Sequence, residues 1–198
     1  MILEAVLLAA GNSQRFGGIK QLALINGRPM IEHCLSQYFV DGALLPTIAK
    51  ISVVLGANES LIRQCDLAQT TLFLAANWQR GMGASLADFV KHIPQTTTHL
   101  LIGLADQIAL KTADFAALIT HSQQNPEMIV CTQYRHVQGV PAIIPRCFFA
   151  ELARLDSDKG ARVLIKQYPN QVHSLVMQNA AIDIDTVQDL NSISNFKS

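Results

Sequence analysis

The sequence has no excess of charge of either sign, because 15 lysines and arginines balance 15 aspartates and glutamates. Without an overall field, the protein has no general attraction to a nucleic-acid backbone or an anionic membrane surface. The chain also lacks an apolar run near the roughly 18 to 20 residues of a membrane span, and a basic region before its first apolar run. We therefore expect a cytoplasmic protein without nucleic-acid or membrane partners, in which any bound anion is held by local groups.

Common metal-binding patterns of cysteine and histidine are absent as well. The cysteines show neither CxxC nor another zinc spacing, which favours reduced, mostly buried thiols: Cys34, Cys65, Cys131 and Cys147. The six histidines form neither HxH nor HExxH. No histidine is therefore assigned a catalytic role.

The composition is that of a protein with a sizeable core, since 49% of the 198 residues are hydrophobic. No repeat, low-complexity tract or linker interrupts the chain, so we expect residues 1–198 to form one domain. Continuous apolar runs typical of buried parallel strands recur at Leu3 to Ala9, "KISVVLG", "TLFLA", "HLLIGLA" and "EMIVCT". Helical patterns alternate with them. One predicted helix has Pro29 as its first residue, one runs from Ala84, and one begins with Thr112 as its capping residue.

This alternation predicts an α/β protein, a three-layer α/β/α sandwich with a mainly parallel, Rossmann-like sheet and ligands at the carboxyl ends of its strands. After about Arg135 the rhythm changes. There "GVPAIIP" is extended, "RCFFAELARL" and "ARVLIKQY" are helical, and "VHSLVM" and "AAIDID" are predicted strands. We interpret this last third as an elaboration of the same sheet.

The loop after the first apolar run, "GNSQRFGGIK", combines flexible backbone with positive charge. Three glycines are expected to adopt positive φ and expose backbone N–H groups to an anion: Gly11, Gly17 and Gly18. Ser13 adds a hydroxyl donor, Arg15 a planar fork for phosphate oxygens, and Lys20 a mobile point charge. Neither the Walker GxxxxGK[ST] pattern nor the Rossmann GxGxxG pattern fits. A polyphosphate-binding loop is the interpretation, and a glycine-rich turn with two solvated cations is the alternative.

The longer string "LLAAGNSQRFGGIKQLALINGRPMIEH" resembles a known family signature, LAAGxSxRxGxxKxL followed by GxPxI. This signature is typical of the nucleotidyltransferase superfamily with the glycosyltransferase-A-like, nucleotide-diphospho-sugar transferase fold. Within it, the chain is most similar to the molybdenum cofactor nucleotidyltransferases, and "LLAAG" resembles their cytidylyltransferase rather than their guanylyltransferase branch, which has Ala-Gly-Gly. The resemblance implies phosphate contacts by Ser13 and Arg15, catalysis by Lys20 and Arg15, and nucleotide contacts by these and by Leu8, Ala9, Ala10 and Gly11.

Asp106 ends the apolar run "HLLIGLADQIAL", where a carboxylate is costly unless it meets a cation or emerges at the strand end. A helix cap or a loop carboxylate is the alternative from position alone. The family shows GDQP or GDMP here, with a magnesium-binding aspartate, so the resemblance implies a metal-binding and catalytic role for Asp106. Ala105 and Ile108 replace the family's glycine and proline.

A second acidic motif, "AAIDIDTVQDL", places Asp183 and Asp185 two residues apart, and so on one face if a strand continues through them. Such carboxylates are often helix-capping residues, and Thr186 is a further capping candidate. The motif resembles the family's DIDTPEDL. By that resemblance Asp185 is the second Mg²⁺ ligand, with Asp183 the weaker candidate.

Two polar positions precede or begin the helix in "NWQRGMGASLADFV". The N…G…S pattern of similar cytidylyltransferases implies that Asn77 and Ser85 contact the nucleotide, at a helix start whose N–H groups favour anions. Trp78 has two interpretations, a stacking surface for a ligand or a partly buried packing residue.

The segments "HVQGVPAIIP" and "DSDKGARVLIKQYP" resemble the family's GHP loop and DRGAR segment, which face the acceptor. The resemblance implies acceptor binding by Gly139, Pro141 and Arg162. Val140 stands where the family has histidine, a change that points to a different acceptor. For Arg162, covering the sheet with its aliphatic stem is the alternative.

The function expected from this resemblance is magnesium-dependent transfer of CMP from CTP to the terminal phosphate of a molybdopterin-type cofactor, with a molybdoenzyme as a further partner. One alternative is a nucleotidyltransferase that uses GTP or acts on a sugar phosphate or polyol phosphate. Another is a non-catalytic nucleotide-binding partner of a molybdoenzyme. The presence of both Lys20 and Asp106 favours an enzyme, because a binding module has no need of both.

Overall fold

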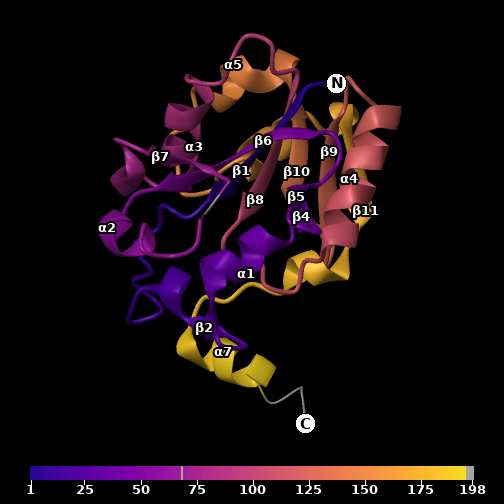
Figure 1. The fold of residues 1–198 in the computed structure, drawn as a ribbon. Helices are drawn as coiled ribbons and strands as arrows, with labels where there is room; N and C mark the ends of the chain where they lie inside the picture. The colour runs from indigo at the N-terminus through magenta and orange to yellow at the C-terminus, as the bar shows by residue number, and fades with distance from the viewer. Residues whose placement is uncertain (68, 195–198) are drawn as a thin grey trace.

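A computed structural model describes residues 1–67 and 69–194. Its centre is a seven-stranded sheet with the strand order β11-β9-β10-β8-β1-β6-β7 (Figure 1). The strands are β1 (Leu3–Leu8), β6 (Ile48–Leu55), β7 (Thr71–Leu74), β8 (His99–Leu104), β9 (Ile129–Tyr134), β10 (Val137–Pro145) and β11 (Val172–Val176). Strand β10 runs antiparallel to both β8 and β9, and every other pairing in this sheet is parallel. The predicted mainly parallel α/β fold is confirmed.

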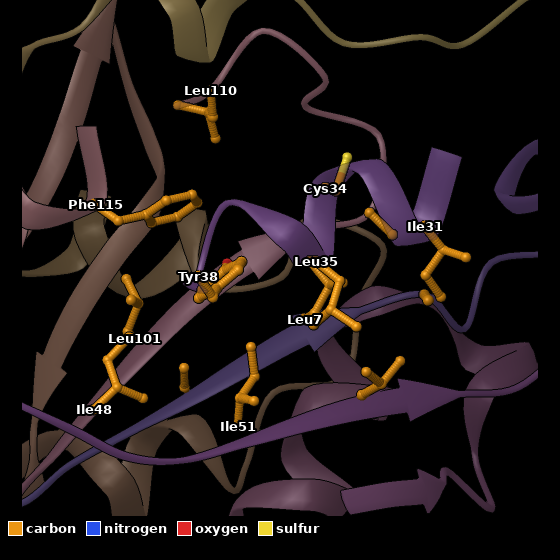
Figure 2. Packing of buried hydrophobic residues seen from close by; sticks show 14 of the residues in the cluster. Leu7, Ile31, Cys34, Leu35, Tyr38, Ile48, Ile51, Leu101, Leu110 and Phe115 are labelled. Atoms are coloured by element: carbon orange, nitrogen blue, oxygen red, sulfur yellow. The ribbon is translucent and has the colours of Figure 1, made fainter. Parts of the chain in front are cut away.

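Helices cover both faces of the sheet because alternate residues of each buried strand enter different cores. Leu7 of β1 belongs to the core beneath α1 (Met30–Ser36) and α4 (Thr112–Gln124). Figure 2 shows this core, where Leu7, Ile51 and Leu101 from the strands meet side chains of α1 and Phe115 of α4. Val6 and Leu8 belong to the opposite core, beneath α3 (Met82–Val90), α5 (Phe149–Leu152) and α6 (Arg162–Gln167).

Shorter elements complete the described part of the chain. They are α2 (Glu59–Ile62), α7 (Val187–Ser194), the hairpins β2 (Leu24–Ile25) with β3 (Arg28–Pro29) and β4 (Phe39–Val40) with β5 (Ala43–Leu44), and the 3-10 turns η1 (Lys20–Leu22), η2 (Trp78–Arg80), η3 (Arg146–Phe148), η4 (Pro169–Gln171) and η5 (Gln178–Ala181). None of the helices within residues 1–67 and 69–194 has the length and apolar character that a membrane span requires.

Three local expectations were wrong. The segment "AAIDID" is not a strand, because it begins in η5 and continues irregularly. Its buried Ile184 instead donates its backbone N–H to Asp106 O at 3.2 Å, which ties this segment to the end of β8. Thr112 does not cap α4, because Lys111 is the N-cap residue and Thr112 is the first residue of the helix. The Asp114 carboxylate accepts from the Lys111 N–H at 2.8 Å. Pro29 precedes α1 rather than opening it.

Candidate active site

The loop after β1 is held in place by one buried side chain, Gln21. Its amide nitrogen donates to Ala9 O at 2.9 Å and Gly11 O at 3.0 Å, and its Oε1 accepts from the Ser13 hydroxyl at 3.1 Å. Positive φ occurs at Ser13 (56°) and Gly17 (73°). The expectation of positive φ at Gly11 and Gly18 was therefore wrong, because a serine makes the first left-handed turn of the loop. Sequence reasoning missed Gln21, although a glutamine after a cationic loop is a suitable brace for backbone carbonyls.

Lys20 lies between two carboxylates from distant parts of the chain. Its Nζ is 2.7 Å from Asp106 Oδ2 and 3.3 Å from Asp185 Oδ1, and Arg15 Nη2 is 3.0 Å from Asp185 Oδ2. Burial lowers the pKa of Lys20, but the two carboxylates outweigh burial and hold that pKa above its usual value. Lys20 is thus a protonated, positioned cation at neutral pH.

The Lys20 and Asp106 side chains are only 15% and 19% exposed, whereas Arg15 is 77% exposed. Burial raises the pKa of Asp106, and the nearby Lys20 charge opposes that rise. An exposed pair such as Arg15 with Asp185 contributes little to stability. The guanidinium of Arg15 can therefore leave Asp185 and contact a ligand at little cost in folding free energy.

Asp106 has a second, unused oxygen. Among the described residues, its buried Oδ1 has no hydrogen-bond partner. Mg²⁺ is commonly held by one or two carboxylates together with substrate phosphates. Within the described part of the chain there is no cluster of three or more His, Cys, Asp or Glu side chains that resembles a complete metal cage. The carboxylates of Asp106 and Asp185 are hard oxygen donors of the kind that a divalent cation takes.

A cavity of about 530 Å³ brings most of the predicted residues together. Ten of them line it: Leu8, Ala9, Ala10, Gly11, Ser13, Arg15, Lys20, Ser85, Asp106 and Asp185. Asn77 is not among the lining residues, because its amide donates to the Asp88 carboxylate at 2.9 and 3.0 Å. This geometry does not support the expected contact of the Asn77 side chain with a nucleotide.

Trp78 also lines this cavity and packs against the second core. A Cβ on Gly56 would lie 2.6 Å from both Trp78 Cβ and Ala10 O, so glycine is what allows these groups to approach. The tryptophan therefore combines the two interpretations of the sequence, a packing residue with a face on the cavity.

A second cavity of about 240 Å³ adjoins the first. Both are lined by Leu8, Met82, Leu104 and Asp158. Arg162 lines the smaller cavity and donates to the Tyr134 hydroxyl at 3.3 Å. Val140 lines it as well, and Asp183 does so rather than joining Asp185 in the larger cavity.

Gly139 and Pro141 are buried and are not among the residues that line the smaller cavity. A Cβ on Gly139 would lie 3.0 Å from Tyr134 Oη and 3.5 Å from Arg162 Nη2. Gly139 thus packs against Tyr134 and Arg162, which line the smaller cavity, and acceptor binding by Gly139 and Pro141 stays a prediction. Lys159, which sequence reasoning missed, lines the cavity from the exposed segment before α6.

Comparison with protein families places this site in context. The model of the MobA-like NTP transferase domain matches residues 5–172. The chain belongs to this family. Its members are nucleotidyltransferases, so the MobA-like assignment supports an enzyme. No curated protein matches the chain at the significance that we required.

Several solved structures share the MobA-like fold. Rv0371c from Mycobacterium tuberculosis H37Rv is 26% identical, with a TM-score of 0.82 and 98% of each chain covered. The structure of Rv0371c in complex with manganese has 23% identity, a TM-score of 0.77 and 98% of each chain covered. Molybdopterin-guanine dinucleotide biosynthesis protein A from Archaeoglobus fulgidus has 14% identity and a TM-score of 0.72, with 98% of this chain and 97% of that chain covered. These TM-scores show a shared fold.

Proposed function

We propose that the chain is a magnesium-dependent cytidylyltransferase that transfers CMP from CTP to the terminal phosphate of molybdopterin, the organic part of the molybdenum cofactor, and releases pyrophosphate. The observation that carries this proposal is the contact of Lys20 Nζ with Asp106 and Asp185, at 2.7 and 3.3 Å, in the wall of the larger cavity. A buried cation beside two carboxylates is suited to a metal-bound polyphosphate. We further propose that residues 1–198 act as one domain in the cytoplasm, with a recipient molybdoenzyme as partner.

The chain's own groups have distinct tasks in this reaction. Ser13 and the exposed Arg15 bind the triphosphate on the loop after β1. An oxygen of the acceptor phosphate attacks the α-phosphorus, the bond from that phosphorus to the bridging oxygen breaks, and pyrophosphate leaves. Lys20 neutralises charge that develops on the α-phosphate and the leaving group.

A magnesium ion bound by Asp106 and Asp185 would add charge neutralisation at the phosphates. The unpartnered Oδ1 of Asp106 supports this assignment. Manganese in the complex of Rv0371c supports a divalent ion in a protein of this fold.

The identity of the acceptor is less well defined by its cavity than the identity of the nucleotide donor. Val140 lines the smaller cavity, at the position where the family that the sequence resembles has a histidine. This difference favours a second candidate function, transfer of a nucleotide to a sugar phosphate or a polyol phosphate.

Product analysis separates the two candidates. The protein is incubated with CTP and Mg²⁺ and with molybdopterin, a hexose 1-phosphate or a polyol phosphate, and the products are identified by mass spectrometry. A cytidylylated molybdopterin supports the proposal. A cytidylylated sugar or polyol, without the pterin product, assigns the second function.

A further inference from the structure

Arg162 is a half-buried cation in the wall of the smaller cavity. It begins α6, and its Nη2 donates to the Tyr134 hydroxyl at 3.3 Å. Two acidic residues line the same cavity, Asp158 and Asp183. Within residues 1–67 and 69–194, however, no carboxylate forms an ion pair with Arg162. The guanidinium therefore keeps its charge for a bound anion.

Most of the donors of Arg162 are also free. Among the described residues, its Nε and Nη1 have no hydrogen-bond partner, and neither nitrogen is sealed from solvent. A guanidinium has five N–H donors in a planar fork that matches phosphate oxygens. Since Arg162 lines the cavity, a phosphate bound there can reach the donors that Tyr134 leaves free.

Tyr134 gives this mobile side chain a fixed partner. It is the last residue of β9, pairs with Val137 of β10, and packs against the core beneath α1 and α4. A Cβ on Gly139 would lie 3.0 Å from Tyr134 Oη and 3.5 Å from Arg162 Nη2, so glycine leaves the room in which the two side chains meet. The phenol is thus held by two paired strands, and the arginine reaches it from a helix.

Such a contact affects how tightly an anion binds. A long arginine side chain loses rotamer freedom when a ligand orders it, and this loss weakens binding. A hydrogen bond that already orients the guanidinium removes part of that loss before the ligand arrives. Tyr134 does not line the larger cavity, so the effect is confined to the ligand of the smaller one.

We propose that Tyr134 is a positioning residue, whose hydroxyl holds the Arg162 guanidinium in the orientation that binds a phosphate group of the acceptor. This inference rests on the proposed function, in which the smaller cavity holds the acceptor. The ligand class is a phosphorylated molecule that Arg162 contacts through its phosphate oxygens. Tyr134 acts through Arg162 and takes no part in the transfer itself.

The first test needs no turnover and uses inorganic phosphate as the probe. Tyr134→Phe removes only the hydroxyl. Tyr168→Phe is the matched control, because the Tyr168 hydroxyl accepts from Gln167 at 3.5 Å on the exposed surface and Tyr168 lines neither cavity. Phosphate is titrated into the 15N-labelled proteins, and NMR follows the arginine Nε–H signals. Arg162→Ala identifies the signal of Arg162, because that variant lacks it.

We expect the Arg162 signal of the wild type to shift and saturate with phosphate. The phosphate concentration at half-saturation should rise about threefold to tenfold in Tyr134→Phe, the usual effect of losing one hydrogen bond. It should stay within about 1.5-fold of wild type in Tyr168→Phe. An Arg162 signal that ignores phosphate, an unchanged half-saturation in Tyr134→Phe, or an equal rise in the control overturns the inference.

The second test asks whether the hydroxyl acts through Arg162. Steady-state KM is measured for CTP and for the acceptor that the wild type uses among molybdopterin, a hexose 1-phosphate and a polyol phosphate. Tyr134→Phe should raise the acceptor KM about threefold to tenfold and leave kcat and the CTP KM within about twofold of wild type. In an Arg162→Ala background, the same substitution should change the acceptor KM by less than about twofold.

An equal rise in both backgrounds contradicts the proposal, because the hydroxyl then acts independently of Arg162. The identity of the product tests the proposed function separately. If the wild type turns over none of the acceptors, the proposed function fails, and the phosphate titration still decides whether Tyr134 positions Arg162.

Discussion

Lys20 Nζ donates a 2.7 Å hydrogen bond to Asp106 Oδ2 and so joins the loop after β1 to the end of β8. The loop that carries Lys20 and the segment that carries Asp106 follow the carboxyl ends of neighbouring strands, because β1 pairs in parallel with β8. Burial makes a lone charge costly, and each of these residues offsets the other's charge. The pair thus organises the candidate site before any ligand arrives.

Replacing Asp106 tests its metal role. Nucleotide with Mg²⁺ should raise the wild-type Tm by about 5–10 °C at a concentration about 100 times Kd, and by much less with EDTA. Asp106→Asn should abolish the difference between Mg²⁺ and EDTA, because the amide is a poor metal ligand. Thermal shift measurements check this, with Asp183→Asn as the control that keeps the difference. An undiminished Mg²⁺ effect in Asp106→Asn would sink the metal assignment.

The donor base is tested at Ala10, which lines the larger cavity beside Trp78. A methyl group there occupies space that a purine needs, so we expect the wild type to prefer CTP over GTP. Ala10→Gly should weaken the preference without reversing it, because one methyl group gives only about 1–3 kcal/mol of discrimination. Values of kcat/KM for both nucleotides check this. A wild type that prefers GTP refutes the cytidylyl assignment and leaves nucleotidyl transfer intact.

Close packing between β8 and Tyr38, the second residue after α1, gives a stability prediction. A Cβ on Gly103 would overlap the Tyr38 hydroxyl, and that buried hydroxyl has no hydrogen-bond partner among the described residues. Gly103→Ala should therefore lower the free energy of unfolding by about 1–3 kcal/mol. Tyr38→Phe removes the overlapping atom and should recover part of that loss in the double variant. Urea unfolding of all four proteins checks this, and purely additive effects would contradict the overlap.

His99 predicts a dependence of stability on pH. Its Nε2 donates to Pro126 O at 2.9 Å, and burial lowers the pKa of His99 below its usual 6.5. The unfolded chain then binds the proton more readily, so this contribution is complete above about pH 6.5 and is lost as the pH falls. His99→Gln should flatten the decline in unfolding free energy between about pH 7 and 5 relative to wild type and to the exposed-site control His136→Gln. Equal slopes in all three proteins would rule out a role for His99.

Apolar runs made the main strands predictable, and loop composition together with the family resemblance predicted ten of the twenty residues that line the larger cavity. The strand β1 and the phosphate-type loop follow from local sequence alone. The pairing of Lys20 with Asp185 spans 165 positions, so tertiary folding had to place it. The hydrogen bonds of the Asn77 amide to Asp88 were not predictable, because they leave no sequence pattern. The alternation in "AAIDID" misled because Ile184 is buried by contact with a loop and not within a sheet.

Lys20 is the residue on which the proposed reaction depends most. Lys20→Ala should lower turnover by roughly a hundredfold or more and weaken nucleotide binding only modestly, because its charge acts mainly as the transition state forms. Thermal melting verifies that the variant is folded, since Asp106 loses its partner. The exposed Lys50→Ala is the control and should retain wild-type turnover.

The most direct measurement of the central claim is pyrophosphate release by the wild type and Lys20→Ala, with Mg²⁺ and each nucleoside triphosphate, in the presence and absence of molybdopterin. We predict release by the wild type that requires molybdopterin, is fastest with CTP, and is nearly lost in Lys20→Ala. Release by Lys20→Ala at a rate close to that of the wild type, or no release by the wild type with any nucleotide, would contradict it.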